Sequence, residues 1–170
     1  MNPLIQFKKI PILPLLIALA LVVGALTAVP ALATPPVSVT TEILGAGTFD
    51  ELDVSAKTGA WKARIDTKGE SDLNVVRVTF QPVGHTGWHT HPGPSLIMVM
   101  SGTVTEYEGD DPSCTPRVHP AGTTFVDPGN HLHLVKNEST TDQAVMVAVP
   151  LIPAGAPRRI DAPNPGVCPF

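Results

Sequence analysis

The chain has 170 residues, of which 43% are hydrophobic, and its 11 Lys and Arg against 15 Asp and Glu give a net charge of −4. This length corresponds to one ordinary domain. The acidic balance argues against a nucleic acid or an anionic membrane surface as a partner.

The first 33 residues have the pattern of a secretory signal. Lys8 and Lys9 supply positive charge, residues 10–26 are apolar, and Ala31-Leu32-Ala33 is a small-x-small cleavage site. An uncleaved membrane anchor is the alternative, because the apolar stretch approaches the length of a transmembrane helix. Prolines within and after the stretch favour removal of residues 1–33, which leaves 170 − 33 = 137 residues and, without the two lysines, a net charge of −6. We therefore expect a secreted or periplasmic protein with no membrane contact after cleavage.

Residues 34–73 are expected to form an N-terminal arm with one or two short strands, because Pro and Gly interrupt short apolar groups there. From residue 74 to residue 152 the chain consists of short β-like segments separated by Gly and Pro. These segments are 76–80, 96–100, 104–107, 123–126, 131–135 and 144–149. The pattern predicts an all-β sandwich or barrel over 74–152, followed by a Pro-rich C-terminal tail over 153–170.

Several of these segments are apolar on both faces. If Ser95 points into the barrel, Ile97 and Val99 point inward as well, because side chains alternate along a strand. A strand that is apolar on both faces is normally covered on both sides. We expect the outer face to be covered by the N-terminal arm, by a second copy in a homodimer, or by both. The outward set is Leu96, Met98, Met100, Leu132 and Leu134.

Three histidines are the candidate metal ligands. His89 and His91 are two residues apart, so in a strand their imidazoles point to the same face. His133, from a later strand, can complete a set of three neutral nitrogen ligands. Such a set suits Fe, Zn, Ni or Cu and leaves coordination positions open for chemistry.

The segments around these histidines resemble the two motifs of the cupin superfamily, over residues 75 to about 150. The first motif has the order His-x-His, three or four residues, Glu, six residues, Gly, and here it reads His89-Thr90-His91, Ser95, Gly102. In the second motif Gly122, Pro128, His133 and Asn137 are in register, while Asn130 stands at a glycine position and Gly129 lies one residue early. The resemblance implies a small secreted single-domain (type-2) cupin: a jelly-roll barrel with an N-terminal arm.

The sequence departs from the cupin pattern at Ser95, which replaces the metal-binding glutamate of the motif. A hydroxyl is a poor ligand for a divalent cation compared with a carboxylate. The resemblance then implies a three-histidine site like those of cupin iron dioxygenases, or a weak or vestigial site. The residues expected around the metal ion or in the pocket are Ser95, Ile97, Val99, His131 and Val135. Among these, His131 is either a fourth ligand or a residue that orients a ligand from outside.

Other polar residues are expected to have ordinary roles. Glu106 and Glu108, on the strand after the first motif, are expected to be solvated, and His119 is expected to face solvent. Trp88 points away from His89 and is expected to pack on the outside of the sheet. Cys114 and Cys168 are expected to form a disulfide that ties the tail to the barrel, because an even cysteine count in an exported chain favours pairing. Two free thiols or a metal role are the alternatives.

Two functions remain open at this level. The first is a metal-dependent enzyme, resembling a three-histidine Fe(II) dioxygenase, with Fe as the preferred ion and Zn, Mn, Ni or Cu as alternatives. The second is a non-catalytic module that binds a small molecule or a metal ion. Both predict a small-molecule ligand or substrate as partner. The substrate itself cannot be deduced from the pattern, because pocket shape depends on loop geometry.

Overall fold

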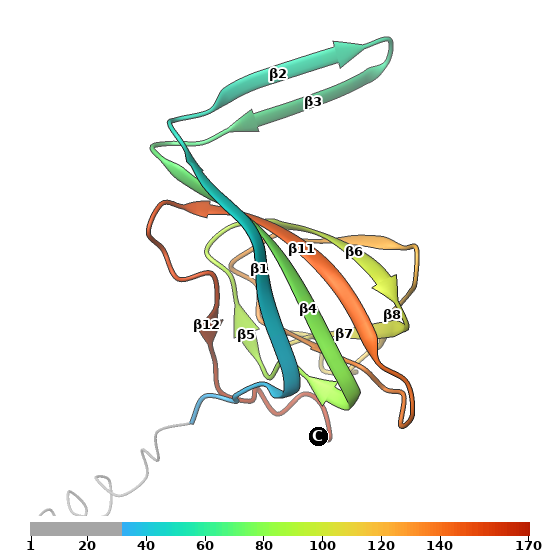
Figure 1. Ribbon diagram of the computed structural model, residues 1–170. Coiled ribbons are helices and arrows are strands. Elements are labelled where there is room, and N and C mark those ends of the chain that lie inside the picture. Colours follow the sequence, from blue (N-terminus) through green and yellow to red (C-terminus); the bar gives the residue numbers. More distant parts are fainter. Residues whose placement is uncertain (1–31) are drawn as a thin grey trace, which may run out of the picture. The chain divides into compact units, whose positions relative to one another are not determined.

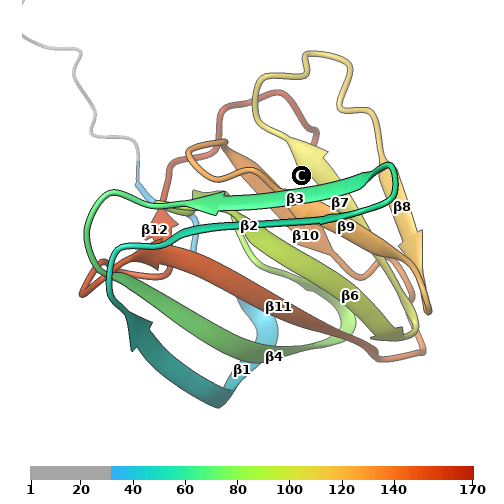
Figure 2. The same cartoon turned by 90° about the horizontal axis from the view of Figure 1, so that it is seen from above.

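The computed structural model describes residues 32–170, which contain twelve β-strands and no helix. Ten strands form one sheet that curls into a barrel, and two form a separate hairpin (Figures 1 and 2). The all-β jelly-roll prediction is therefore confirmed. In the described range no helix is long and apolar enough to cross a membrane. Nearly all of the predicted signal segment, residues 1–31, lies outside the described residues.

The strands are β1 (Val37–Phe49), β2 (Asp53–Thr58), β3 (Trp61–Asp66), β4 (Ser71–His85), β5 (His89–Thr90), β6 (Ser95–Ser101), β7 (Thr103–Glu108), β8 (Arg117–Pro120), β9 (Thr124–Asp127), β10 (His133–Lys136), β11 (Ala144–Pro153) and β12 (Ile160–Asp161). All their pairings are antiparallel. This is the ladder type that short connections allow.

The N-terminal arm is more regular than the sequence indicates. β1 has 13 residues rather than the short strand expected, and it pairs with β4 along almost its whole length, from Val37 opposite His85 to Phe49 opposite Ser71. Its side chains are almost all exposed, so no burial pattern marks it in the sequence. Main-chain pairing with β4 holds this strand, and β4 itself begins at Ser71, three residues before the expected start of the barrel.

The register predicted for β6 is the one observed. Ser95, Ile97 and Val99 are buried, whereas Leu96, Met98 and Met100 are exposed, at 63%, 50% and 55%. Ile97 and Val99 belong to the main core. The other buried members of that core are Val76, Val78, Phe80, Val104, Val135, Ala144 and Met146.

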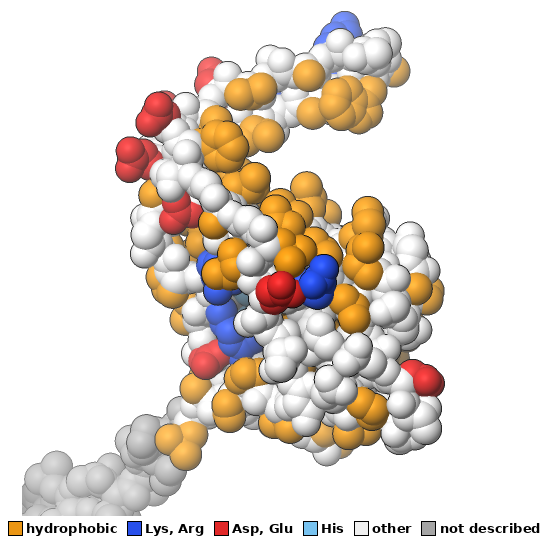
Figure 3. All heavy atoms as spheres, viewed as in Figure 1, with side chains coloured by type: hydrophobic (Ala, Val, Ile, Leu, Met, Phe, Trp, Pro, Cys, Tyr) orange, Lys and Arg blue, Asp and Glu red, His pale blue; other side chains and the backbone are white. Residues whose placement is uncertain are grey.

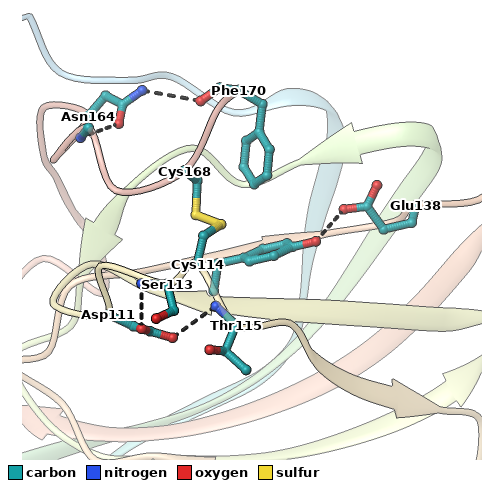
Figure 4. The surroundings of a disulfide bond; sticks show 10 residues. Asp111, Ser113, Cys114, Thr115, Glu138, Asn164, Cys168 and Phe170 are labelled. Carbon is teal, nitrogen blue, oxygen red and sulfur yellow. Dashed lines mark hydrogen bonds between the residues drawn. A yellow bond between two sulfur atoms is a disulfide. The ribbon is translucent and has the colours of Figure 1, made fainter.

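The C-terminal tail covers the outward side of β10, in place of the N-terminal arm or second copy that the sequence pattern predicts. Leu134 is buried in a cluster with Trp88, Tyr107 and Cys168. Cys168 forms a disulfide with Cys114, and the two Cα atoms are 5.2 Å apart (Figure 4). The disulfide prediction is confirmed. A bridge across 54 residues stabilises the fold by about 4 kcal/mol in the chain-entropy model.

The outward side of β6 stays exposed in the single chain. Val126 on β9, 57% exposed, lies opposite Leu96 and extends the apolar face formed with Met98 and Met100. Hydrophobic side chains gather over β6 and β11 and along the hairpin (Figure 3). A contiguous exposed apolar face of this kind is typical of a protein–protein contact.

We therefore expect a homodimer that buries this face. Met98→Glu should convert the dimer to a monomer, because a buried unpaired charge is costly. Ile43→Glu, at a comparably exposed site on β1, is the control and should leave the dimer intact. Sedimentation velocity of the three proteins measures the effect. A monomeric wild type at micromolar concentration would contradict the dimer.

Candidate metal centre

Three imidazoles converge inside the barrel. His89 is on β5, His91 follows that strand, and His133 begins β10 directly opposite His89. The ring centroids are 4.3 Å apart for His89 and His133, 4.8 Å for His89 and His91, and 5.3 Å for His91 and His133. One nitrogen of each ring lies within 4.8 Å of those of the other two. The structure thus brings together the three residues singled out from the sequence.

The backbone fixes the tautomer of each ring. Nδ1 of His89 lies 2.9 Å from the Gly87 carbonyl oxygen, Nδ1 of His133 lies 3.2 Å from that of His131, and Nδ1 of His91 contacts that of Arg158. A carbonyl oxygen only accepts hydrogen bonds, so Nδ1 must carry the hydrogen in each ring. In the neutral rings the lone pair is then on Nε2, which is the arrangement found in metal-binding histidines.

Gly87 has a second role in holding His89. Its φ is 69°, and a Cβ at this position would lie only 2.2 Å from the carbonyl oxygen of Thr34. A side chain here would displace either the N-terminal arm or the carbonyl that holds His89. Glycine allows both contacts because it has no Cβ.

Burial favours the neutral form of His89 and of His133. It lowers the pKa of His89 far below the ordinary value, and the positive charge of Arg159, and of His133 when that ring is protonated, lowers it further. Burial also lowers the pKa of His133 to about 4, although the negative charge of Asp127 acts in the opposite direction. Neutral imidazole is the form that binds a metal, so at neutral pH no proton has to leave these two rings first.

A cavity of about 430 Å³ opens beside the three rings. Its walls are mainly apolar side chains from β1, β4, β6, β10 and β11. Arg158 and Arg159 of the C-terminal tail add positive charge. The Arg159 guanidinium donates to the Thr86 carbonyl oxygen at 2.6 Å and contacts Asp161. The volume suits a small organic molecule rather than a polymer.

Comparisons with known proteins agree with this architecture. Residues 76–150 match the family model of the cupin domain. Residues 76–150 are therefore a cupin domain. Among curated proteins no significant match was found.

Solved structures related to this cupin are distant. A cupin-like protein from Thermotoga maritima is 22% identical, with 54% of this chain and 65% of that chain covered and a TM-score of 0.46. A protein with a double-stranded β-helix domain from Klebsiella pneumoniae is 16% identical, with 75% of this chain and 84% of that chain covered and a TM-score of 0.47. A recombinant oxalate oxidase in complex with glycolate is 32% identical, with 46% of this chain and 41% of that chain covered and a TM-score of 0.41. The chain therefore spans less than two thirds of the length of the Thermotoga protein and less than half of the oxidase chain.

The residues expected around the cupin site divide into two groups. Ser95, Ile97 and Val135 line the cavity. Val99 is buried in the core but does not line it. The His131 imidazole points to Glu108 and Asp110, at 2.5 Å and 3.4 Å, so its side chain is neither a fourth ligand nor a wall of the cavity. His131 contributes through its backbone carbonyl, which holds His133.

Asp127 was missed by the sequence analysis. Only 1% of it is exposed, and it lies opposite Ser95 on the neighbouring strand β9. It precedes Pro128, so in the sequence it looks like an ordinary turn residue. The signal that could have found it is its register: cross-strand partners share a face, so an inward Ser95 implies an inward Asp127.

The interior also contains two glutamates that we expected in solvent. Glu106 and Glu108 are 5% and 7% exposed, because they lie opposite the inward residues Val135 and His133 of β10. Burial raises the pKa of Glu106 to about 7, and the negative charge of Glu108 adds to this. Glu108 pairs with Arg117. His119 is also partly buried rather than solvent-facing, with its ring stacked 4.1 Å from that of Phe125.

The raised pKa of Glu106 predicts a pH-dependent stability. Between its ordinary value of 4.5 and about 7, the folded chain holds this proton more tightly than the unfolded chain. The stability that Glu106 contributes is therefore complete below pH 4.5 and is lost as the pH rises through about 7. Glu106→Gln mimics the protonated side chain, so it should melt at the same temperature as wild type at pH 5 and at a higher one at pH 8. Thermal melts at both pH values measure this, and an equal difference at the two would contradict it.

Proposed function

We propose that this chain is a metal-binding cupin that holds a divalent transition metal through Nε2 of His89, His91 and His133. The observation that carries the proposal is the set of three Nδ1 groups bound to backbone carbonyls, which leaves three lone pairs in one place. Three protein nitrogens leave coordination positions open. The proposed ion is Fe(II), with Zn, Mn, Ni or Cu as alternatives that imidazole also accepts.

We propose further that the cavity takes a small organic anion. Its apolar walls exclude water, and two tail arginines supply positive charge at the same place. Bound Fe(II) would supply redox chemistry with dioxygen, as in cupin dioxygenases. The protein's own part would be to orient the ligand against the three-histidine face and to keep the pocket dry.

A non-catalytic binding module is the second candidate, and Ser95 is the observation that favours it, because the motif's metal-binding glutamate is replaced. Oxygen uptake by the iron-loaded protein over a panel of small carboxylic acids, diketones and thiols separates the two. Uptake with one class supports the enzyme. Tight binding of a panel member without uptake supports the module.

Metal binding should require all three histidines. Protein without an affinity tag should contain one ion per chain by elemental analysis. His89→Ala or His91→Ala should lower the affinity of the protein for the ion by at least about 100-fold, since loss of a residue that only hydrogen-bonds to a metal ligand already costs about 10–100-fold. His131→Ala is the matched control and should keep its metal, because that imidazole points away from the site. Equal metal content in wild type and both ligand variants would rule out this site.

We also propose that the chain acts outside the cytoplasm. The signal-like pattern of residues 1–33 and the Cys114–Cys168 disulfide support this, since disulfides persist in oxidising compartments. Thr34, the first residue after the proposed cleavage, is already anchored: its Oγ1 accepts from the Trp88 N–H at 2.7 Å and donates to the Ala162 carbonyl oxygen at 3.0 Å.

Mass spectrometry of exported protein should find an N-terminus at Thr34 and a mass two hydrogens below that of the reduced chain. The removed segment carries the cleavage pattern, and an oxidising compartment forms the bridge. A full-length chain in the membrane fraction, or two thiols that alkylate without reduction, would contradict export in this form.

A further inference from the structure

One carboxylate oxygen of Asp127 is buried and has no hydrogen-bond partner in the described part of the chain, which is energetically unfavourable. Oδ1 accepts a hydrogen bond from the Gly129 N–H at 2.9 Å. Oδ2 is fully buried and has no hydrogen-bond partner among the described residues. Buried carboxylates are normally paired with a cation, hydrogen-bonded or bound to a metal, because desolvation strongly disfavours an isolated charge.

The unpartnered oxygen lies beside the three-histidine site. Asp127 Oδ2 is 3.7 Å from Nε2 of His91. That distance is too long for a hydrogen bond. It is compatible with two ligands of one ion, because atoms that are each about 2.1 Å from a metal lie at most about 4.2 Å apart. Among the described residues of this site, the ligand atoms that all lie within 4.8 Å of one another are those of the three histidines, so Asp127 would have to move toward the ion to join them.

The tautomer of His91 strengthens the case. Its Nδ1 donates to the Arg158 carbonyl, so in the neutral ring Nε2 presents a lone pair toward Asp127. A cation bound by this lone pair would also give the buried carboxylate a partner.

The position of Asp127 explains how it could replace the missing motif residue. Ser95 stands where the cupin motif has glutamate, and Asp127 is its direct cross-strand neighbour on β9. Both face the interior. A carboxylate on β9 can therefore approach the same ion from one strand further along the barrel wall. The turn after it is constrained, because a Cβ on Gly129, whose φ is 80°, would lie 2.6 Å from the backbone of Gly93.

We propose that Asp127 is the fourth protein ligand, so that the site is three-histidine-one-aspartate rather than three-histidine. This inference rests on the proposed metal-binding function. It implies that the negative charge of the site was moved from β6 to β9 and was not lost with Ser95. Three neutral imidazoles leave the full double charge of the ion inside the barrel, and one carboxylate halves it. A carboxylate also makes the set more suitable for Mn and Fe than imidazoles alone.

The test uses Co²⁺ as the probe with the whole purified protein. Asp127→Asn keeps the shape of the side chain but removes its charge, and it should weaken Co²⁺ binding by at least about 100-fold, which exceeds the usual loss for an outer partner. Its visible Co²⁺ spectrum should change as well, since a ligand is lost. Glu106→Gln, the same kind of change at a buried carboxylate that does not line the cavity, is the matched control and should keep the wild-type affinity and spectrum.

The double variant Asp127→Asn with Ser95→Glu provides a rescue. It returns a carboxylate to the same ion from the opposite strand, so Co²⁺ affinity should recover most of what Asp127→Asn loses. If Asp127 had only a structural role, a glutamate at position 95 on β6 would not restore the Co²⁺ affinity. If Asp127→Asn fails to fold, a crystal structure of the Co²⁺-loaded wild type decides, with an Asp127 oxygen expected about 2.0–2.2 Å from the ion.

The outcomes separate this inference from the proposed function. If His89→Ala loses the ion while Asp127→Asn keeps wild-type affinity and spectrum, Asp127 is not a ligand and the metal-binding proposal stands. Weakened binding with an unchanged spectrum and no rescue also overturns the inference, because Asp127 would then only orient His91. A wild-type protein that binds no Co²⁺ would contradict both the fourth-ligand inference and the metal-binding proposal.

Discussion

Three backbone carbonyl oxygens are the constraint on which the rest of the site depends. An imidazole can rotate about its Cβ–Cγ bond and can carry its hydrogen on either nitrogen. The carbonyls of Gly87 and His131 each hold the histidine two residues later in the chain, so the same local arrangement occurs at His89 and at His133. His91 is held by Arg158, 67 residues away. Local chain geometry thus fixes two rings, and the packing of the tail fixes the third.

The interior of the barrel divides into an apolar part and an acidic part. Val76, Val78 and Met146 belong to the core and also line the cavity. Asp127, Glu106 and Glu108 are buried on the strands β9 and β7. Carboxylates in such numbers are costly inside a small domain unless cations balance them. Arg117 balances Glu108 from the protein side, and the metal proposed for the three-histidine site would balance Asp127.

The sequence predicts those parts of this structure that depend on local periodicity and spacing. His89 and His91 share a face because strands alternate, and the same alternation gives the inward Ser95, Ile97 and Val99. The pairing of Cys114 with Cys168 follows because the chain contains only two cysteines.

What the sequence does not predict depends on which strands become neighbours. β1 has no burial pattern and is defined by main-chain pairing with β4. Glu106 and Glu108 look like surface residues until β7 is placed against β10. Asp127 looks like a turn residue until β9 is placed against β6. In each case the missing information is long-range strand pairing, which local patterns do not contain.

The C-terminal tail has a consequence for how the protein is made. Its β12 pairs with β5 on the edge that carries His89, its Arg158 carbonyl holds His91, and its Cys168 helps to bury Leu134 beside His133. These tail residues, within 158–168, come at least 25 positions after His133, the last of the three histidines. A nascent chain with every histidine already synthesised therefore still lacks the groups that set their geometry. The centre is completed only when residues 158–168 have been synthesised and have packed against the barrel.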